Sequence, residues 1–370
     1  KGSAISGAEA SVATQTGSLQ YAYPIAMPPG RNGMVPSLAL AYSSQGSIYG
    51  GIAAGWSLDV PIIKKDTSKS ALATSGMADQ DLVAAGGDAR DNDMFVSGLA
   101  GGRPLVRVTE TGDTGTFLTY RAQNDNSAAR YERMNTASTF RWRVRTNDGT
   151  THYFGESSRF FACGGINDDY APLTSSIDAF GNEVQYFYTS SPSWTGSCVL
   201  SSIKYGMNTA ANITDHAQVI LDWGKPLVCD ATTGQMDQPY GTTPVGAQLD
   251  FRDGTGRVLG APPLKSITVQ VKGPARTHSR VLTMAYSTPG ATPSGVTNAA
   301  FDSATCNGSV TPFRQLDSIE ETATSNADTS TTVTLPKVQF TYGGPVINRT
   351  ISTPALAPAG TAGSYSEGYR

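Results

Sequence analysis

Alternating apolar and polar positions predict short β-strands along most of the chain. Leu19, Tyr21, Tyr23 and Ile25 occupy every second position near the N-terminus, which places them on one face of a strand. Turn residues, above all Gly, Pro, Asn and Asp, separate this run from the next. Further strands are expected at 37–42, 56–60, 94–96, 104–108, 116–120, 201–206, 217–223, 264–271, 279–286, 315–320 and 331–342.

Two hairpins are predicted more sharply. In the segment 139–154 an Asp148-Gly149 turn joins two strands, and in 173–188 a Gly181-Asn182 turn does the same. The even spacing of such units predicts an all-β, antiparallel sandwich or wrapped sheet with little helix. A short helix around 79–85 is the exception left open, with an ordered loop as the alternative.

The first hairpin also carries a run of basic residues. Apolar positions alternate there with arginines, so the arginines share one face. A phosphate-binding strip is one interpretation, and the solvent face of an exposed strand is the favoured one. The alternating residues are Phe140, Trp142 and Val144 on one side and Arg141, Arg143 and Arg145 on the other.

Composition agrees with a β-rich chain and sets limits on function. The 370 residues contain 40 glycines and only 15% charged residues, with a net charge of −3. Tight turns use the glycines, and long surface helices would need more Glu, Lys and Arg. The charge argues against a nucleic-acid partner, and no apolar run of about 20 residues predicts a membrane span. The start at Lys1 lacks an initiator Met and a signal peptide, which predicts a mature or excised segment.

The domain plan follows the same patterns. Residues 1–16 are small and polar and are expected to form a flexible lead-in. Residues 17–343 form the predicted β domain, divided into two subdomains near 66–100 in one alternative. Residues 344–370 are rich in Pro, Ala and Gly and are expected to form an exit linker.

Four cysteines, Cys163, Cys198, Cys229 and Cys306, lie beside loop-forming residues and form no Cys-x-x-Cys pair. An even number of cysteines in loops favours two disulfides and an oxidising, extracellular compartment over four free thiols. Three pairings exist, and Cys163–Cys198 with Cys229–Cys306 is preferred because it closes the shorter loops.

Two segments carry a family resemblance. Residues 17–44, with Pro28-Pro29-Gly30-Arg31, and the following Gly55-Trp56-Ser57-Leu58 resemble the start of the SpvB-type N-terminal domain. This domain occurs in the Salmonella plasmid virulence protein SpvB and in the B component of insecticidal toxin complexes. Segments 142–155 and 177–188 resemble two hairpins of the same family and of Rhs repeats. The resemblance implies a β-rich structural or delivery module of a secreted bacterial toxin, with other toxin domains or subunits as its partners and no chemistry of its own.

Candidate chemistry is sparse. His152, His216 and His278 are isolated in sequence, and no Gly-x-Ser-x-Gly elbow or phosphate-binding glycine loop occurs. The adjacent Glu320-Glu321 pair does not match the Glu-x-Glu of the family's ADP-ribosylating domain. We therefore expect no enzyme activity, no catalytic residue, no cofactor and no metal.

Three alternatives stay open. Asp88, Asp91 and Asp93 could bind calcium, but solvated turn residues are the favoured interpretation, because the residue order of an EF-hand is missing. A module that binds host-surface glycans or a receptor would use exposed aromatic residues. A hydrolase with a site assembled from distant residues is the remaining alternative class.

Overall fold

The computed structural model confirms an antiparallel, all-β chain. The described part contains no α-helix. Its short helices are 3₁₀-helices, η1 (Arg31–Gly33), η3 (Gly98–Ala100) and η4 (Thr209–Ala211). Its strands form two large sheets and two small hairpins. The structure describes residues 9–14, 16–46, 52–58, 60–66, 95–108, 117–134, 140–156, 170–190, 198–223, 228–229, 236–237, 248–250, 257–259, 264–272, 277–287, 315–325 and 332–342.

The first sheet has four strands in chain order, β1 (Glu9–Ala13), β2 (Ser18–Pro24), β3 (Ala39–Ser43) and β4 (Trp56–Leu58). Tyr21, Tyr42 and Trp56 are cross-strand partners and form an aromatic row, with ring centroids 6.0 Å and 5.3 Å from Trp56. Such pairs stabilise a sheet face beyond their buried area. Within the predicted lead-in 1–16, Glu9–Ala13 form β1, which pairs with β2 along its whole length.

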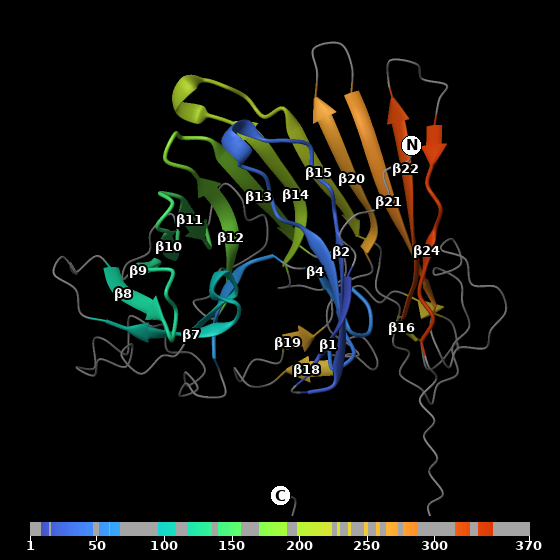
Figure 1. The fold of residues 1–370 in the computed structure, drawn as a ribbon, viewed down its shortest axis with the longest axis horizontal. Helices are drawn as coiled ribbons and strands as arrows, with labels where there is room; N and C mark the ends of the chain where they lie inside the picture. Colours follow the sequence, from blue (N-terminus) through green and yellow to red (C-terminus); the bar gives the residue numbers. More distant parts are fainter. Residues whose placement is uncertain are drawn as a thin grey trace, which may run out of the picture. The chain divides into compact units, whose positions relative to one another are not determined.

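Eight strands of the second sheet close on themselves. They are β5 (Ile62–Lys65), β6 (Phe95–Ser97), β7 (Arg103–Arg107), β8 (Phe117–Ala122), β9 (Arg130–Met134), β10 (Trp142–Arg145), β11 (Thr151–Phe154) and β12 (Tyr170–Ile177). Each strand pairs with the next, and β12 pairs with both β5 and β11. We call this closed set of strands the ring (Figure 1).

The interior of the ring is aromatic. Phe95, Tyr120 and Trp142 contact one another with centroids 4.9 to 6.1 Å apart, and each is at most 1% exposed. Arg133 places its guanidinium 4.9 Å from the Phe95 ring centroid. The alternation that places Trp142 inside also places Arg143 outside, as the sequence predicted.

From β12 the sheet continues as an open meander. β12 is followed by β13 (Glu183–Ser190), β14 (Cys198–Met207), β15 (Ala217–Trp223), β20 (Leu264–Lys272), β21 (Thr277–Ser287) and β22 (Gln315–Ser325). Two short strands, β23 (Thr332–Thr334) and β24 (Val338–Gln339), both pair with β22. The small hairpins are β16 (Val228–Cys229) with β17 (Met236–Asp237), and β18 (Gln248–Asp250) with β19 (Arg257–Leu259).

The chain divides into two compact units, Lys1–Gln339 and Phe340–Arg370. The predicted domain 17–343 and exit linker 344–370 stay predictions, as does the alternative boundary near 66–100. Residues 79–85, where a short helix was one interpretation, lie outside the described residues. No helix of the described part is long and apolar enough to cross a membrane.

Candidate functional site

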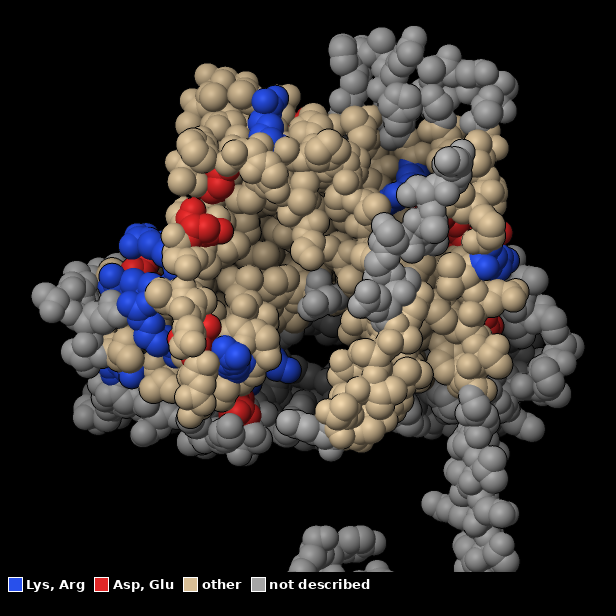
Figure 2. Space-filling model, in the orientation of Figure 1, with Lys and Arg blue, Asp and Glu red and all other residues tan. Residues whose placement is uncertain are grey.

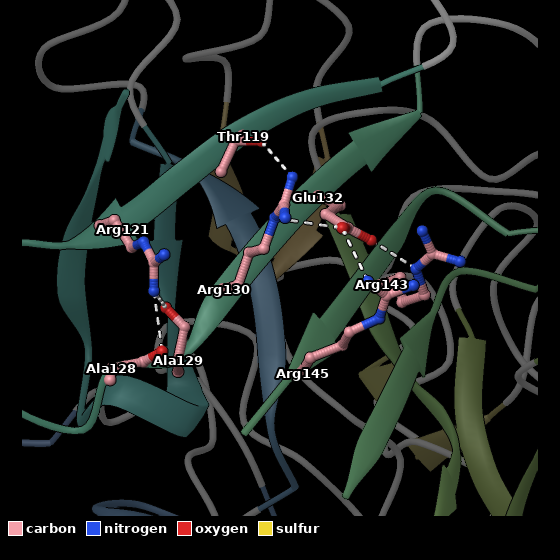
Figure 3. A network of polar contacts seen from close by, with 8 residues as sticks. All are labelled: Thr119, Arg121, Ala128, Ala129, Arg130, Glu132, Arg143 and Arg145. Carbon is pink, nitrogen blue, oxygen red and sulfur yellow. Dashed lines mark hydrogen bonds and ion pairs between the residues drawn. The ribbon is translucent and has the colours of Figure 1, made fainter. Parts of the chain in front are cut away.

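On the ring, one buried carboxylate, that of Glu132, contacts three arginines. Glu132 Oε1 lies 3.2 Å from Arg130 Nε and 3.3 Å from Arg145 Nη1, and Oε2 accepts a hydrogen bond from Arg143 Nε. Figure 3 shows these guanidiniums converging on Glu132 from β9 and β10. The Glu132 side chain is only 1% exposed. A charge buried this deeply requires opposite charges, which the arginines supply.

Strand pairing explains the cluster. Arg143 lies directly opposite Glu132, and Arg145 lies opposite Arg130, in the antiparallel β9–β10 pair. These four residues face away from the ring interior, because Tyr131, Trp142 and Val144 at intervening positions point inward and are buried. A fourth arginine on this wall, Arg121, donates to the carbonyls of Ala128 and Ala129 at 2.8 Å and 3.2 Å.

The favoured interpretation of the arginine run is the solvent face of an exposed strand. Arg143 and Arg145 do face outward, but both bind Glu132, and the Arg143 side chain is only 23% exposed. Sequence reasoning missed Glu132 because no strand was predicted over 130–134. The one available signal was the alternation of Arg130 and Glu132 with Tyr131.

The second feature is the segment 26–33, which we call the strap. It carries the Pro28-Pro29-Gly30-Arg31 motif and crosses the face of the open sheet (Figure 1). Three sheet side chains bind its backbone carbonyls. Tyr205 Oη donates to Pro28 O at 3.0 Å, His216 Nε2 lies 3.0 Å from Pro29 O, and Arg280 donates to Ala26 O.

The strap also bonds back to the sheet. Arg31 Nε donates to Gly206 O at 2.8 Å. Burial raises the pKa of Tyr205 to about 12, so its hydroxyl stays protonated and able to donate. Prolines lack an N–H, so the carbonyls of Pro28 and Pro29 are the main-chain groups that this motif offers to the sheet. The motif is therefore explained by docking of the strap.

The predicted Gly181-Asn182 turn is present and tightly held. Asp178 Oδ1 accepts the backbone N–H of Phe180 and of Asn182 at 2.9 Å and 2.8 Å. Asn32 of the strap and Asn208 of β14's following turn add hydrogen bonds to Asp178 Oδ2 and to Phe180 O. The Asp-x-x-Gly-Asn motif thus fixes a turn and links it to the strap. The Asp148-Gly149 turn is present as well, with Thr146 N donating to Thr150 O at 3.0 Å.

Two of the histidines, His152 and His216, make separate structural contacts. His152 Nδ1 lies 2.8 Å from Ser176 Oγ, and burial lowers the pKa of its imidazole. His216 contacts the strap, as described above. His278 belongs to β21, and its side chain lies outside the described residues.

The remaining sequence candidates are placed only in part. Cys198 begins β14 and Cys229 belongs to β16, whereas Cys163 and Cys306 lie outside the described residues, so the disulfide pairing stays a prediction. Asp88, Asp91 and Asp93 also lie outside them. Within the described part, no group of three His, Cys, Asp or Glu residues is arranged to hold a metal ion. Glu320 and Glu321 belong to β22, where Glu321 pairs with Arg280 at 3.1 Å.

A closed ring continuous with an open antiparallel sheet, and a strap fixed across that sheet, define a β-structural module. The chain belongs to the family described as Salmonella virulence plasmid 65kDa B protein, SpvB, whose model matches residues 13–198. The strap and the Asp178–Asn182 turn both fall within this match. The resemblance inferred from sequence is thereby confirmed.

Solved structures share the fold. The TcdB2-TccC3 crystal structure has a TM-score of 0.60 at 16% identity, over 91% of this chain and 17% of that chain. The Photorhabdus luminescens Tc holotoxin pore gives 0.61 at 16% identity, over 92% and 16%. The N-terminal domain of effector protein SpvB from Salmonella typhimurium strain LT2 gives 0.52 at 17% identity, over 80% and 97%. No curated protein matches the chain.

The chain therefore spans about one sixth of the Tc proteins it resembles, but corresponds to almost all of the SpvB N-terminal domain.

Proposed function

We propose that this chain is a non-catalytic structural module of a large secreted bacterial toxin of the Tc type, where it forms part of the wall that encloses or delivers a toxic payload. The observation that carries the proposal is the shared fold with TcdB2-TccC3, which covers 91% of this chain and 17% of that chain. Its partners in this proposal are the other domains and subunits of the toxin.

The polar contacts support a structural role. Glu132, Asp178 and Asn208 are engaged in ion pairs or turn hydrogen bonds. Tyr205 and His216 bind the strap. Each of these side chains stabilises the fold. Polar groups that are taken up by structural contacts are expected in a structural module more than in a reactive centre.

The architecture supports the same role. The ring has no free edge within its eight strands, so it resists further pairing with other chains. The meander that leaves β12 adds a broad antiparallel sheet, and the strap is fixed across its face. A stiff surface of this kind suits a wall.

The test uses the natural full-length polypeptide that contains this chain, together with any co-encoded toxin subunit. Electron microscopy should show a hollow particle with this fold in its wall, and a segment inside it should resist added protease. Gly206→Ala, whose added Cβ would overlap the strap-binding His216, should make that segment cleavable, while Gly101→Ala, whose added Cβ meets no atom within 4 Å, should not. A particle without a lumen, or a segment cleaved equally in all three proteins, would contradict the proposal.

The non-catalytic part has its own test. The purified chain is assayed with panels of glycoside, ester and peptide substrates. We expect no turnover above the buffer rate. Turnover that disappears on His152→Gln or Glu132→Gln in a folded variant would show that the chain is an enzyme.

A further inference from the structure

Two guanidiniums on the outer wall of the ring are each held at one nitrogen. Arg143 binds Glu132 through Nε, and Arg145 binds it through Nη1. Within the described part of the chain neither arginine has another hydrogen bond or ion pair. Their remaining N–H groups, including both terminal nitrogens of Arg143, therefore have no acceptor among the described residues.

The charge at this point does not balance. Three guanidiniums surround one carboxylate, so the described residues of the cluster carry a net charge of about +2. Figure 2 shows Lys and Arg side chains gathered over the strands of the ring. A phosphate group, with a charge of about −1.5 to −2 at neutral pH, would neutralise the cluster, whereas one carboxylate would neutralise only half of it.

The donors are also held in place before any ligand arrives. Arg143 has two cross-strand partners in the ring, Glu132 on β9 and Tyr153 on β11, and lies between them. Tyr153 is itself held by an edge contact with Phe140, with ring centroids 4.9 Å apart. Side chains fixed by such contacts lose little conformational entropy on binding. Arg143 and the half-exposed Arg145 are two positions apart on β10, so their side chains share a face.

We infer that Arg143 and Arg145, positioned by buried Glu132, form a binding site for a phosphate group on the outer wall of the ring. Arg130, which also contacts Glu132, adds to its positive potential. Arginine binds phosphate through paired N–H donors, and the spare donors of the two guanidiniums match several phosphate oxygens. This inference does not depend on the proposed toxin role.

The test titrates the purified 370-residue chain with inorganic phosphate at low ionic strength, with binding followed by calorimetry and by NMR of the arginine Nε–H groups. We expect saturable binding that shifts the Arg143 and Arg145 signals. Arg145→Gln should weaken binding by about tenfold, the loss of one charge-assisted contact. Arg103→Gln is the matched control, because Arg103 belongs to the same ring but pairs with Asp125. It should change binding by less than about twofold.

Further variants keep the outcome decisive. Arg143→Lys retains the charge but loses the fork of N–H donors, so it should weaken phosphate binding while the unfolding midpoint is kept. Acetate should bind more weakly than phosphate, and phosphoserine should compete with inorganic phosphate, because it presents the same kind of charged phosphate oxygens. Equal losses in Arg145→Gln and Arg103→Gln, acetate binding as tight as phosphate, or an absence of saturable binding would each overturn the inference.

Discussion

Gly206 lies against His216 so closely that a Cβ atom added at Gly206 would be 1.9 Å from His216 Nδ1. The φ angle of Gly206 is +83°, a region that other residues seldom adopt. Both residues also bind the strap, Gly206 through its carbonyl and His216 through Nε2. The close approach of these two residues therefore lies between two of the contacts that hold the strap.

The first prediction is that Gly206→Ala destabilises the chain by at least about 3 kcal/mol, because it combines backbone strain with displacement of His216. Urea unfolding at pH 7 measures the loss. Gly101→Ala is the control, since Gly101 has a φ of +65° but no atom within 4 Å of its added Cβ. It should cost about 1 kcal/mol, the strain alone. Equal losses would mean that contact with His216 is unimportant.

The second prediction concerns the buried ion pairs of the ring. Glu132→Gln should lower the free energy of unfolding by about 3 kcal/mol, since it leaves partly buried guanidiniums without a counter-charge. Asp125→Asn breaks the more exposed Arg103–Asp125 pair and should leave the unfolding midpoint nearly unchanged. If both variants behave alike, the Glu132 cluster has no special role in stability.

The third prediction is a loss of stability in acid through Asp178. Burial raises the pKa of this carboxyl, but hydrogen bonds from Asn182, Asn32 and the Phe180 N–H outweigh burial and hold the pKa below its ordinary value. The charged carboxylate therefore stabilises the fold above an unfolded pKa of about 3.9, and this contribution is lost as the pH falls through the folded pKa. Asp178→Asn should be less stable than wild type at pH 6, and the gap should narrow below about pH 4. A gap independent of pH would contradict the mechanism.

The fourth prediction assigns a milder pH effect to His152. Burial lowers the pKa of this histidine in the folded chain, so the unfolded chain binds the proton more readily. Stability attributable to His152 should be complete above an unfolded pKa of about 6.5 and decline as the pH falls below it. His152→Gln should reduce the loss of unfolding free energy between pH 7.5 and pH 5.5. An unchanged slope would show that His152 does not titrate on unfolding.

The fifth prediction is the disulfide pattern Cys163–Cys198 and Cys229–Cys306. Peptide mapping of the non-reduced protein after secretion should give these two linked pairs and no free thiol. Recovery of a Cys198–Cys229 peptide, or four alkylated thiols, would exclude this pairing.

Much of the fold could be predicted from local patterns. The alternation of Trp142 and Val144 with Arg143 identified β10 and its inward face, and turn chemistry located both hairpins. Strand β9 was not predicted, because charged residues occupy three of its five positions, Arg130, Glu132 and Arg133. A buried Glu132 is stable only beside arginines of a second strand, and one-dimensional patterns do not reveal that partner.

The long-range contacts were not predicted either, because local patterns do not reveal partners that are distant in the sequence. Closure of the ring depends on β12 pairing with β5, and docking of the strap depends on Tyr205 and His216, which lie 177 and 187 residues beyond Pro28 and Pro29. The Pro28-Pro29-Gly30-Arg31 motif was recognisable as a family signature before its physical purpose was visible. The structure gives the reason for the motif, because the carbonyls of Pro28 and Pro29 contact Tyr205 and His216 of the sheet.

Strand β12 has a consequence for how the chain tolerates changes in length. It pairs with β5 through Tyr170–Pro172, and with β11 and β13 through its later residues. Removing one residue from its middle would shift the pairing with β5 relative to the pairings with β11 and β13, and would reverse which side chains of one half point into the ring. Natural variants of this chain should therefore keep the length of β12 constant, and absorb insertions and deletions in the turns between other strands.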